Sequence, residues 1–293
     1  MKTIKYIFFS MSLLLLLTSC EKEITLDLPV VEPKIVIEGY IENGMAPSVI
    51  ITKSAPYFDP IDINTLLNSY VSNAIVTVSD GNKTEQLSLD TVSTYPFYMY
   101  VRKSVYRTKH IIGEVGKRYD LRVEVDGNVY TSSTTISPLV AFDSLWYILG
   151  PENDTIGDLF ALGTDKGNEY NYYRVFTKII GKDFTFVPIF GSVWDDKFFN
   201  GETFTVQLYH GFASNIMNPD EDWTMGYKKG DTVIVKLSTM DYDSYKFWSA
   251  AESEILYGAN PFTNTTSVPT NIQGGAIGCW TGMGSSYATI ICN

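Results

Sequence analysis

The stretch GKRYDLRVEVDGNVY, residues 116–130, decides the fold class because it is the clearest β-hairpin in the chain. Apolar and polar residues alternate on both sides of Asp126-Gly127, and an Asp-Gly pair is typical of a two-residue turn between antiparallel strands. One face of such a hairpin packs on a core and the other meets solvent. The stretch therefore predicts a protein built from antiparallel β-sheets.

Two further hairpins are expected upstream. Residues 34–42 lead into Asn43-Gly44 and return in 49–52, and residues 74–78 lead through an Asp-Gly-Asn turn to 84–89. Tyr119, two residues before the inward-facing Leu121, is placed like the tyrosine corner of immunoglobulin-like sandwiches. We therefore expect an N-terminal immunoglobulin-like β-sandwich over residues 34–140.

Ser137-Pro138 marks the expected boundary, and residues 141–293 predict a second antiparallel β domain. Its strand signals are separated by a polar, glycine-bearing crossing at residues 150–168. The period then changes, and a helix is expected at about 241–257, capped by Asp241 or Asp243. The expected strands are 142–147, 170–180, 203–209 and 232–237.

The N-terminal sequence predicts that the protein is exported to the cell envelope. Lys2 and Lys5 precede an apolar run, residues 7–17, that is too short to span a membrane and has the length of a signal-peptide core. The run ends in Leu17-Thr18-Ser19-Cys20, which resembles the lipobox of bacterial lipoproteins. We expect residues 1–19 to be a lipoprotein signal peptide, Cys20 to be the lipidated N-terminus and residues 20–33 to be a tether.

Composition excludes several classes of function. Apolar residues make up 45% of the chain and aromatic residues 14%, which is ample for packed cores and excludes disorder. The net charge of −11 becomes about −13 once Lys2 and Lys5 leave, and an acidic surface argues against nucleic acid as a partner. The two histidines, His110 and His210, have no metal-ligand spacing, so no metal and no cofactor is expected.

No catalytic motif occurs in the sequence. Residues 282–286, Gly-Met-Gly-Ser-Ser, do not form the Gly-x-Ser-x-Gly elbow of serine hydrolases. A pair of carboxylates for glycoside hydrolysis leaves no local signature, because folding makes its geometry. The expectation is a non-catalytic protein, with a glycan- or peptide-cleaving enzyme as a less favoured alternative.

Two aromatic, acidic loops are candidate ligand or partner contacts, because long loops in compact domains are often functional. The first, residues 54–70, carries Tyr57, Phe58, Asp59 and Asp62, and the second, residues 215–230, carries Asp220, Asp222 and Trp223. The first loop could equally be a plain crossover between strands, and the second lacks the ligand spacing and the glycine of a twelve-residue calcium loop.

Cys279 and Cys292 are the only other cysteines. If Ser285-Ser286 form the tip of a two-residue hairpin, counting outward places the two cysteines opposite each other. Disulfides persist outside the cytoplasm, so a disulfide between them is a possible pairing. The alternative is two separate small apolar side chains.

Several motifs together resemble a known family. They are the lipobox, Glu38-Gly39 in the first strand, the Tyr-x-Leu-x-Val run at Tyr119 and two segments near the C-terminus, GANPF (258–262) and VPTNIQGGAIG (268–278). Trp280 and Gly282 continue this pattern, whereas Cys279 is a less usual neighbour. The chain resembles Bacteroidota outer-membrane lipoproteins with a domain of unknown function that are commonly encoded beside TonB-dependent receptors.

The resemblance implies a setting and a partner but carries no catalytic residues. It implies an outer-membrane lipoprotein that faces the cell exterior and assists a TonB-dependent receptor in nutrient uptake. The ligand would be a small molecule, a peptide or a glycan. The alternative from another functional class is a surface carbohydrate-binding or adhesive module.

Overall fold

The computed structural model describes residues 32–55, 65, 68–94, 101–150, 155–167, 169–211, 224–257 and 267–293. Within these ranges the chain is mainly β-strand, with the helix α3 (Tyr242–Tyr257) in its C-terminal half. Residues Pro33–Asn293 form one compact unit. No helix in the described ranges is both long enough and apolar enough to cross a membrane.

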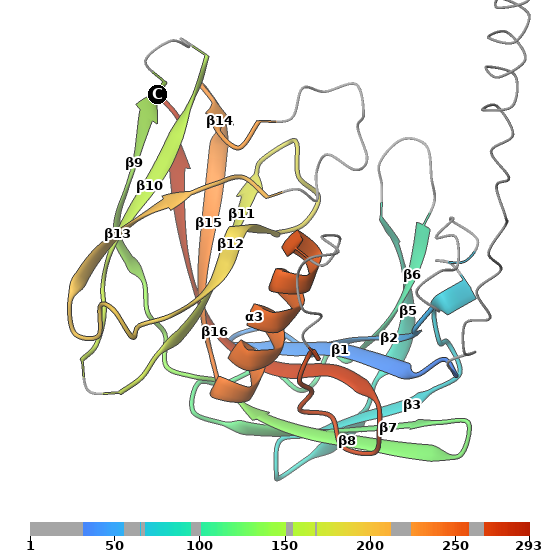
Figure 1. Ribbon diagram of the computed structural model, residues 1–293. Coiled ribbons are helices and arrows are strands. Elements are labelled where there is room, and N and C mark those ends of the chain that lie inside the picture. The colour runs from blue at the N-terminus through green and yellow to red at the C-terminus, as the bar shows by residue number, and fades with distance from the viewer. Residues whose placement is uncertain are drawn as a thin grey trace, which may run out of the picture. The chain divides into compact units, whose positions relative to one another are not determined.

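The strands form three sheets (Figure 1). The longest has, in spatial order, β12 (Val187–Asp195), β11 (Tyr172–Ile179), β15 (Thr232–Met240), β16 (Ile277–Ile291), β1 (Ile35–Glu42), β2 (Ser48–Lys53), β6 (Val101–Arg107) and β5 (Ser88–Thr94). A four-stranded sheet has the order β4 (Thr84–Gln86), β3 (Ile75–Ser79), β7 (Arg118–Val125) and β8 (Asn128–Thr135). The third has β13 (Thr203–Leu208), β10 (Ile156–Thr164) and β14 (Tyr227–Lys228), with β9 (Phe142–Leu149) also paired to β10.

The expected mainly β architecture is confirmed, with a sandwich-like arrangement in the first half. A hydrophobic cluster joins apolar residues of β1 and β2 to those of β3 and β7. The alternation in β7 explains this packing, because Tyr119, Leu121, Val123 and Val125 are buried while the residues between them face outward. The core of the sandwich therefore lies between the four-stranded sheet and one end of the long sheet.

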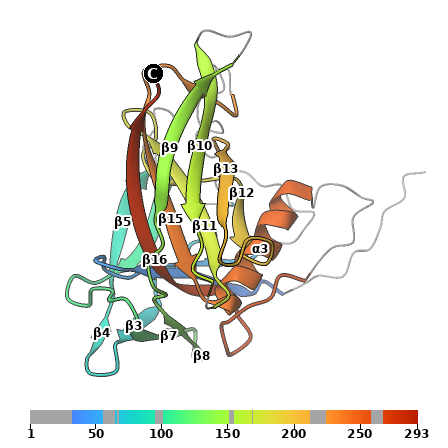
Figure 2. The same cartoon turned by 90° about the vertical axis from the view of Figure 1, so that its left-hand side faces the viewer.

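A single strand, β16, belongs to both halves of the molecule. Its first part pairs in parallel with β1, from Val36↔Ile277 to Glu42↔Met283, and its second part pairs antiparallel with β15, from Thr239↔Gly284 to Thr232↔Ile291. Figure 2 shows β16 continuing from the sandwich to the C-terminus. Ile136 belongs to the first cluster and Val140 to the second, but Ile272, Ala276 and Trp280, which lie after the boundary expected at residue 140, also belong to the first cluster. Because β16 contributes to both, the two cores lie within one compact unit.

The hairpin at residues 116–130 is confirmed as β7 and β8, paired from Arg118↔Thr135 to Val125↔Asn128. Asp126 and Gly127 both have positive φ, at 51° and 79°, as a type I′ turn requires. The expected tyrosine corner is also present. The Tyr119 hydroxyl accepts a hydrogen bond from Glu114 N at 2.8 Å and donates one to Ile112 O at 3.1 Å, which ties the preceding loop to β7.

Replacing Tyr119→Phe should lower the free energy of unfolding by about 1 to 2 kcal/mol, because two backbone groups lose their partner while the buried ring is kept. Urea denaturation of both proteins measures this loss. Tyr242→Phe is the control, since its ring is 54% exposed, and it should change stability by less than about 0.5 kcal/mol. Equal effects of the two substitutions would contradict the role of the corner.

The expected helix is confirmed as α3, and Asp241 caps it. Asp241 Oδ1 accepts a hydrogen bond from Ser244 N at 2.8 Å. Trp248 Nε1 donates to Thr281 Oγ1 on β16, and the Tyr245 hydroxyl donates to Asp195 on β12. The helix thus covers the face of the long sheet that is turned away from the two cores, as Figure 1 shows.

The hairpin expected at Ser285-Ser286, and with it the Cys279–Cys292 disulfide, is wrong. Both serines lie inside β16 and pair with Ser238 and Leu237 of β15. The two cysteines lie at opposite ends of this strand, separated by on the order of 40 Å of extended chain, whereas a disulfide needs α-carbons within about 7 Å. Both cysteines are free thiols and both are buried.

Candidate functional site

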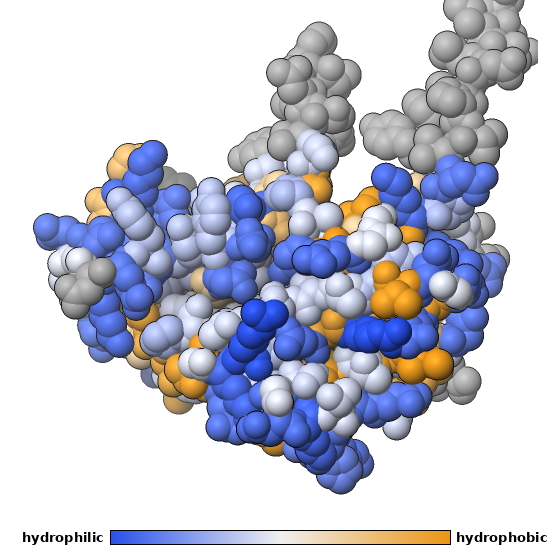
Figure 3. Space-filling model, turned by 90° about the horizontal axis from the view of Figure 1, so that it is seen from below, coloured by the Kyte–Doolittle hydropathy of each residue, from blue (hydrophilic) through white to orange (hydrophobic). Residues whose placement is uncertain are grey.

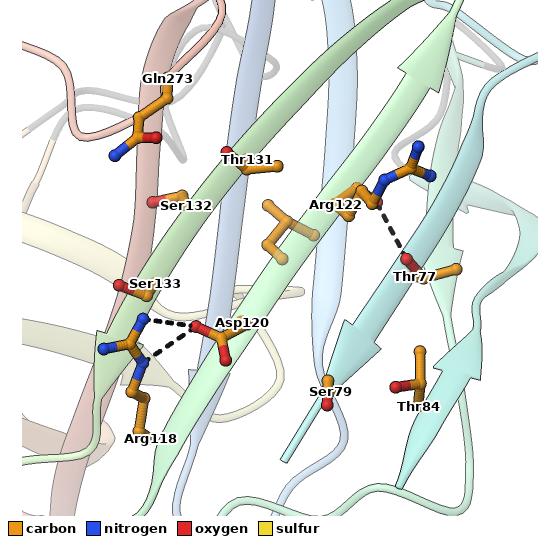
Figure 4. A pocket seen from close by; sticks show the side chains of 11 residues that line it. Thr77, Ser79, Thr84, Arg118, Asp120, Arg122, Thr131, Ser132, Ser133 and Gln273 are labelled. Carbon is orange, nitrogen blue, oxygen red and sulfur yellow. Dashed lines mark hydrogen bonds and ion pairs between the residues drawn. The ribbon is translucent and has the colours of Figure 1, made fainter. Parts of the chain in front are cut away.

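A groove of about 490 Å³ lies on the outer face of the four-stranded sheet (Figure 4). Strands β3, β4, β7 and β8 supply most of its lining, and Gln273 adds to it from the segment that precedes β16. Gln273 is held there by backbone hydrogen bonds to Thr131 at 2.8 and 3.2 Å. The lining consists of Thr77, Ser79, Thr84, Arg118, Asp120, Leu121, Arg122, Thr131, Ser132, Ser133 and Gln273.

Strand register arranges these side chains in two rows that run across the strands. The first row is Ser133, Asp120, Ser79 and Thr84, which oppose one another on β8, β7, β3 and β4. The second row is formed in the same way by Thr131, Arg122 and Thr77. Neighbouring strands lie about 4.8 Å apart and the two rows about 6.7 Å apart, so the face is a regular grid of polar groups.

Each charged side chain that lines the groove has a partner of opposite charge. Arg118 donates to Asp120 Oδ1 through both Nε and Nη2, each at 2.9 Å, as drawn in Figure 4. Arg122 forms an ion pair with Glu124, the next outward residue of β7. Since these side chains are about half exposed, each pair contributes little to stability. Each pair compensates the positive charge of its arginine locally.

Several polar groups of the groove have no hydrogen-bond partner among the described residues. They are Asp120 Oδ2, Arg118 Nη1 and the side chains of Thr84, Thr131, Ser133 and Gln273. The only apolar lining residue, Leu121, is 2% exposed because its side chain points into the sandwich core. Figure 3 shows the molecule from this side: hydrophilic residues cover most of the surface and hydrophobic ones occur in separate small patches. The groove therefore offers hydrogen bonds rather than apolar contact.

A buried ionic network lies elsewhere, on the face of the long sheet that is turned away from the two cores. Lys236 Nζ on β15 lies 3.1 Å from Glu42 Oε2 on β1, and the Tyr287 hydroxyl on β16 donates to the other oxygen of Glu42. The ammonium also lies over the rings of Phe176 and Phe186, at 4.4 and 5.2 Å from their centres. Burial lowers the pKa of Lys236, and Glu42 opposes that shift. The network braces the two halves of the molecule.

One pair of carboxylates does come together, but inside the protein. Asp165 accepts hydrogen bonds from Tyr173, Asn171 and Gly201, and Asp196 accepts one from Asn171 N at 2.7 Å. Their exposed fractions are 4% and 0%. Burial, together with the charge of Asp165, raises the pKa of Asp196. These buried groups organise the loops around β11 and are not placed to act on an external glycan.

The residues predicted as contacts from the sequence lie outside the described ranges. Tyr57, Phe58, Asp59 and Asp62 fall in residues 56–64, and Asp220, Asp222 and Trp223 fall in residues 212–223. Cys20 also lies outside them. In the described part of the chain, no group of three or more His, Cys, Asp or Glu side chains is arranged to hold a metal ion.

A comparison with known protein families gives a match that covers most of the chain. A family model described as a domain of unknown function, DUF4249, matches residues 21–287. The chain belongs to this family. The match includes the first hydrophobic core, most of the second, the whole groove and most of β16. No curated protein matches the chain.

Proposed function

We propose that this DUF4249 protein is a non-catalytic outer-membrane lipoprotein that captures a ligand for a TonB-dependent transporter. The observation that carries the proposal is the groove of Figure 4, a hydrogen-bonding surface on a rigid sheet whose polar groups are left free to bind. The lipobox ending at Cys20 supports a lipid anchor, and the charged tether Glu21-Lys22-Glu23 that follows it supports exposure at the cell surface. The resemblance in sequence supports the receptor partner.

The groove favours binding over catalysis. Its lining holds one carboxylate, Asp120, whereas glycoside hydrolysis by the usual mechanisms needs two carboxyl groups on either side of the scissile bond. Its hydroxyls belong to Thr and Ser residues, with no histidine in the lining to activate them. A ligand held there would therefore be passed on unchanged.

Pull-down of the native protein tests the proposal. The protein carries a tag on its exposed C-terminal residue, Asn293, and is recovered from outer membranes dissolved in mild detergent. It should be recovered together with a TonB-dependent barrel. Deletion of the gene should then reduce uptake of one nutrient by that receptor. Full uptake of every candidate nutrient, with no barrel recovered, would eliminate the proposal. The alternative, a surface module that works without a transporter, predicts ligand binding but no barrel.

A variant with Cys20→Ala is the matched control for the anchor. Several acyl chains hold a protein durably at a membrane, while a protein without them is released. The variant should appear in the soluble fraction, and a variant that still sediments with membranes after a salt wash would contradict lipidation at Cys20.

A further inference from the structure

We propose that the groove on the four-stranded sheet binds a neutral glycan chain that lies across the strands. This inference rests on the proposed ligand-capture function and names the class of its ligand. It is carried by the free polar groups, the charge compensation and the spacing of the groove.

The chemistry of the lining excludes other classes of ligand from this groove. A lipid or an aromatic compound needs apolar walls, and the single apolar lining residue, Leu121, points into the core. An anion needs uncompensated positive charge, and here Arg118 is paired with Asp120 and Arg122 with Glu124. What the surface does offer is a set of hydroxyl, amide, guanidinium and carboxylate groups that match a ligand rich in hydroxyls.

The Arg118–Asp120 pair can bind two hydroxyls of a sugar chain. Because Nε and Nη2 of Arg118 share the same oxygen of Asp120, one donor nitrogen and one acceptor oxygen stay available at the two ends of the ion pair, as Figure 4 shows. One hydroxyl of a bound chain can donate to the carboxylate oxygen while another accepts from the guanidinium. Hydrogen bonds to charged groups are the stronger ones, so this pair should be the anchor of the site.

The spacing of the rows favours a chain over a single sugar. The row of Ser133, Asp120, Ser79 and Thr84 presents one polar side chain per strand, about every 4.8 Å. That interval is close to the length of one hexose residue in a polysaccharide. Thr131 and Gln273 extend the free polar groups on the β8 side of the groove. A chain that crosses the strands would thus meet a hydrogen-bonding group at each sugar.

Affinity electrophoresis of the full mature protein in gels with soluble polysaccharides tests the inference. The neutral probes are dextran, laminarin, xylan and mannan, and the acidic probes are alginate and heparin. At least one neutral polysaccharide should retard the protein. Asp120→Ala should weaken this binding about tenfold or more, since it removes the charged acceptor of the anchor.

The matched control is Asp90→Ala, which removes another exposed strand carboxylate that lies near an arginine, Arg107, outside the groove. It should bind like the unchanged protein. The inference is overturned if no neutral polysaccharide retards the protein, if only the acidic ones do, or if Asp120→Ala binds as strongly as Asp90→Ala. Recovery of a transporter barrel is measured separately on native membranes, so the glycan and the transporter can each fail alone.

Discussion

Replacing Glu42→Ala should lower the free energy of unfolding by about 3 to 5 kcal/mol, because it leaves the buried ammonium of Lys236 without its partner. Glu42 is 1% exposed and Lys236 is 7% exposed, so water cannot replace the lost carboxylate. The variant also removes the acceptor of the Tyr287 hydroxyl, which lies on the strand shared by both halves. Urea denaturation at neutral pH should show the loss as a lower midpoint.

The pH dependence of the unfolding free energy of Glu42→Ala provides a second test. Burial already lowers the pKa of Lys236 in the folded protein, and removing Glu42 removes the charge that opposes the shift. Between this lowered pKa and the ordinary value in the unfolded chain, the unfolded state binds more protons, so stability rises with pH. The Glu42→Ala variant should therefore recover part of its lost stability as the pH is raised.

A double variant, Glu42→Leu with Lys236→Met, is the control for this pair. Replacing both members of a buried ion pair by apolar groups of similar size is often neutral or stabilising. The double variant should therefore be more stable than Glu42→Ala alone. If Glu42→Ala costs less than about 1 kcal/mol, the two charges are not desolvated as the structure shows them.

Local pattern was enough to predict much of the fold. The hairpin at Asp126-Gly127 and the helix after Asp241 each depend on neighbours within a few residues. The stretch 150–168 was misread because β10 does not alternate between apolar and polar residues: Leu159 and Ala161 face the second core, while the equally apolar Phe160 and Leu162 lie on the other face. Without a period of two, a short apolar run between polar and glycine residues does not indicate a strand.

The error at Ser285-Ser286 has a physical reason in the neighbouring glycines. Gly282 and Gly284 indicate a turn in the sequence, yet in the structure they allow another backbone to approach closely. A β-carbon on Gly282 would lie 2.7 Å from Thr135 O, and one on Gly284 would lie 2.1 Å from Ser137 O. The segment that needs this space is more than a hundred residues away, so local reasoning could not find it.

The groove could not be predicted from the sequence for a related reason. Arg118, Asp120 and Arg122 were visible as outward residues of the hairpin, where a solvated face is the ordinary interpretation. Their alignment with Ser79 and Thr84 depends on the pairing of β7 with β3 and of β3 with β4. The order of strands in a sheet must be known before polar groups on different strands can be recognised as one surface.

Trp280→Ala is expected to have an effect as large as that of Glu42→Ala, again about 3 to 5 kcal/mol, because it empties the centre of the sandwich core. The indole is fully buried and its Nε1 donates to Tyr119 O at 3.0 Å. It lies against Gly39 so closely that a β-carbon there would be 2.7 Å from the ring. Because backbone lies so close to the indole at this contact, the cavity that Trp280→Ala creates can collapse only a little.

Denaturant unfolding of three variants measures this core contribution. Trp280→Phe keeps most of the ring volume and should lose less stability than Trp280→Ala, while Phe198→Ala removes an aromatic ring that is 91% exposed and should change stability by less than about 0.5 kcal/mol. The slope of the unfolding transition should stay constant, so that the midpoints report stability alone. A cost for Trp280→Ala no greater than that for Phe198→Ala would show that the tryptophan does not hold the two sheets of the sandwich together.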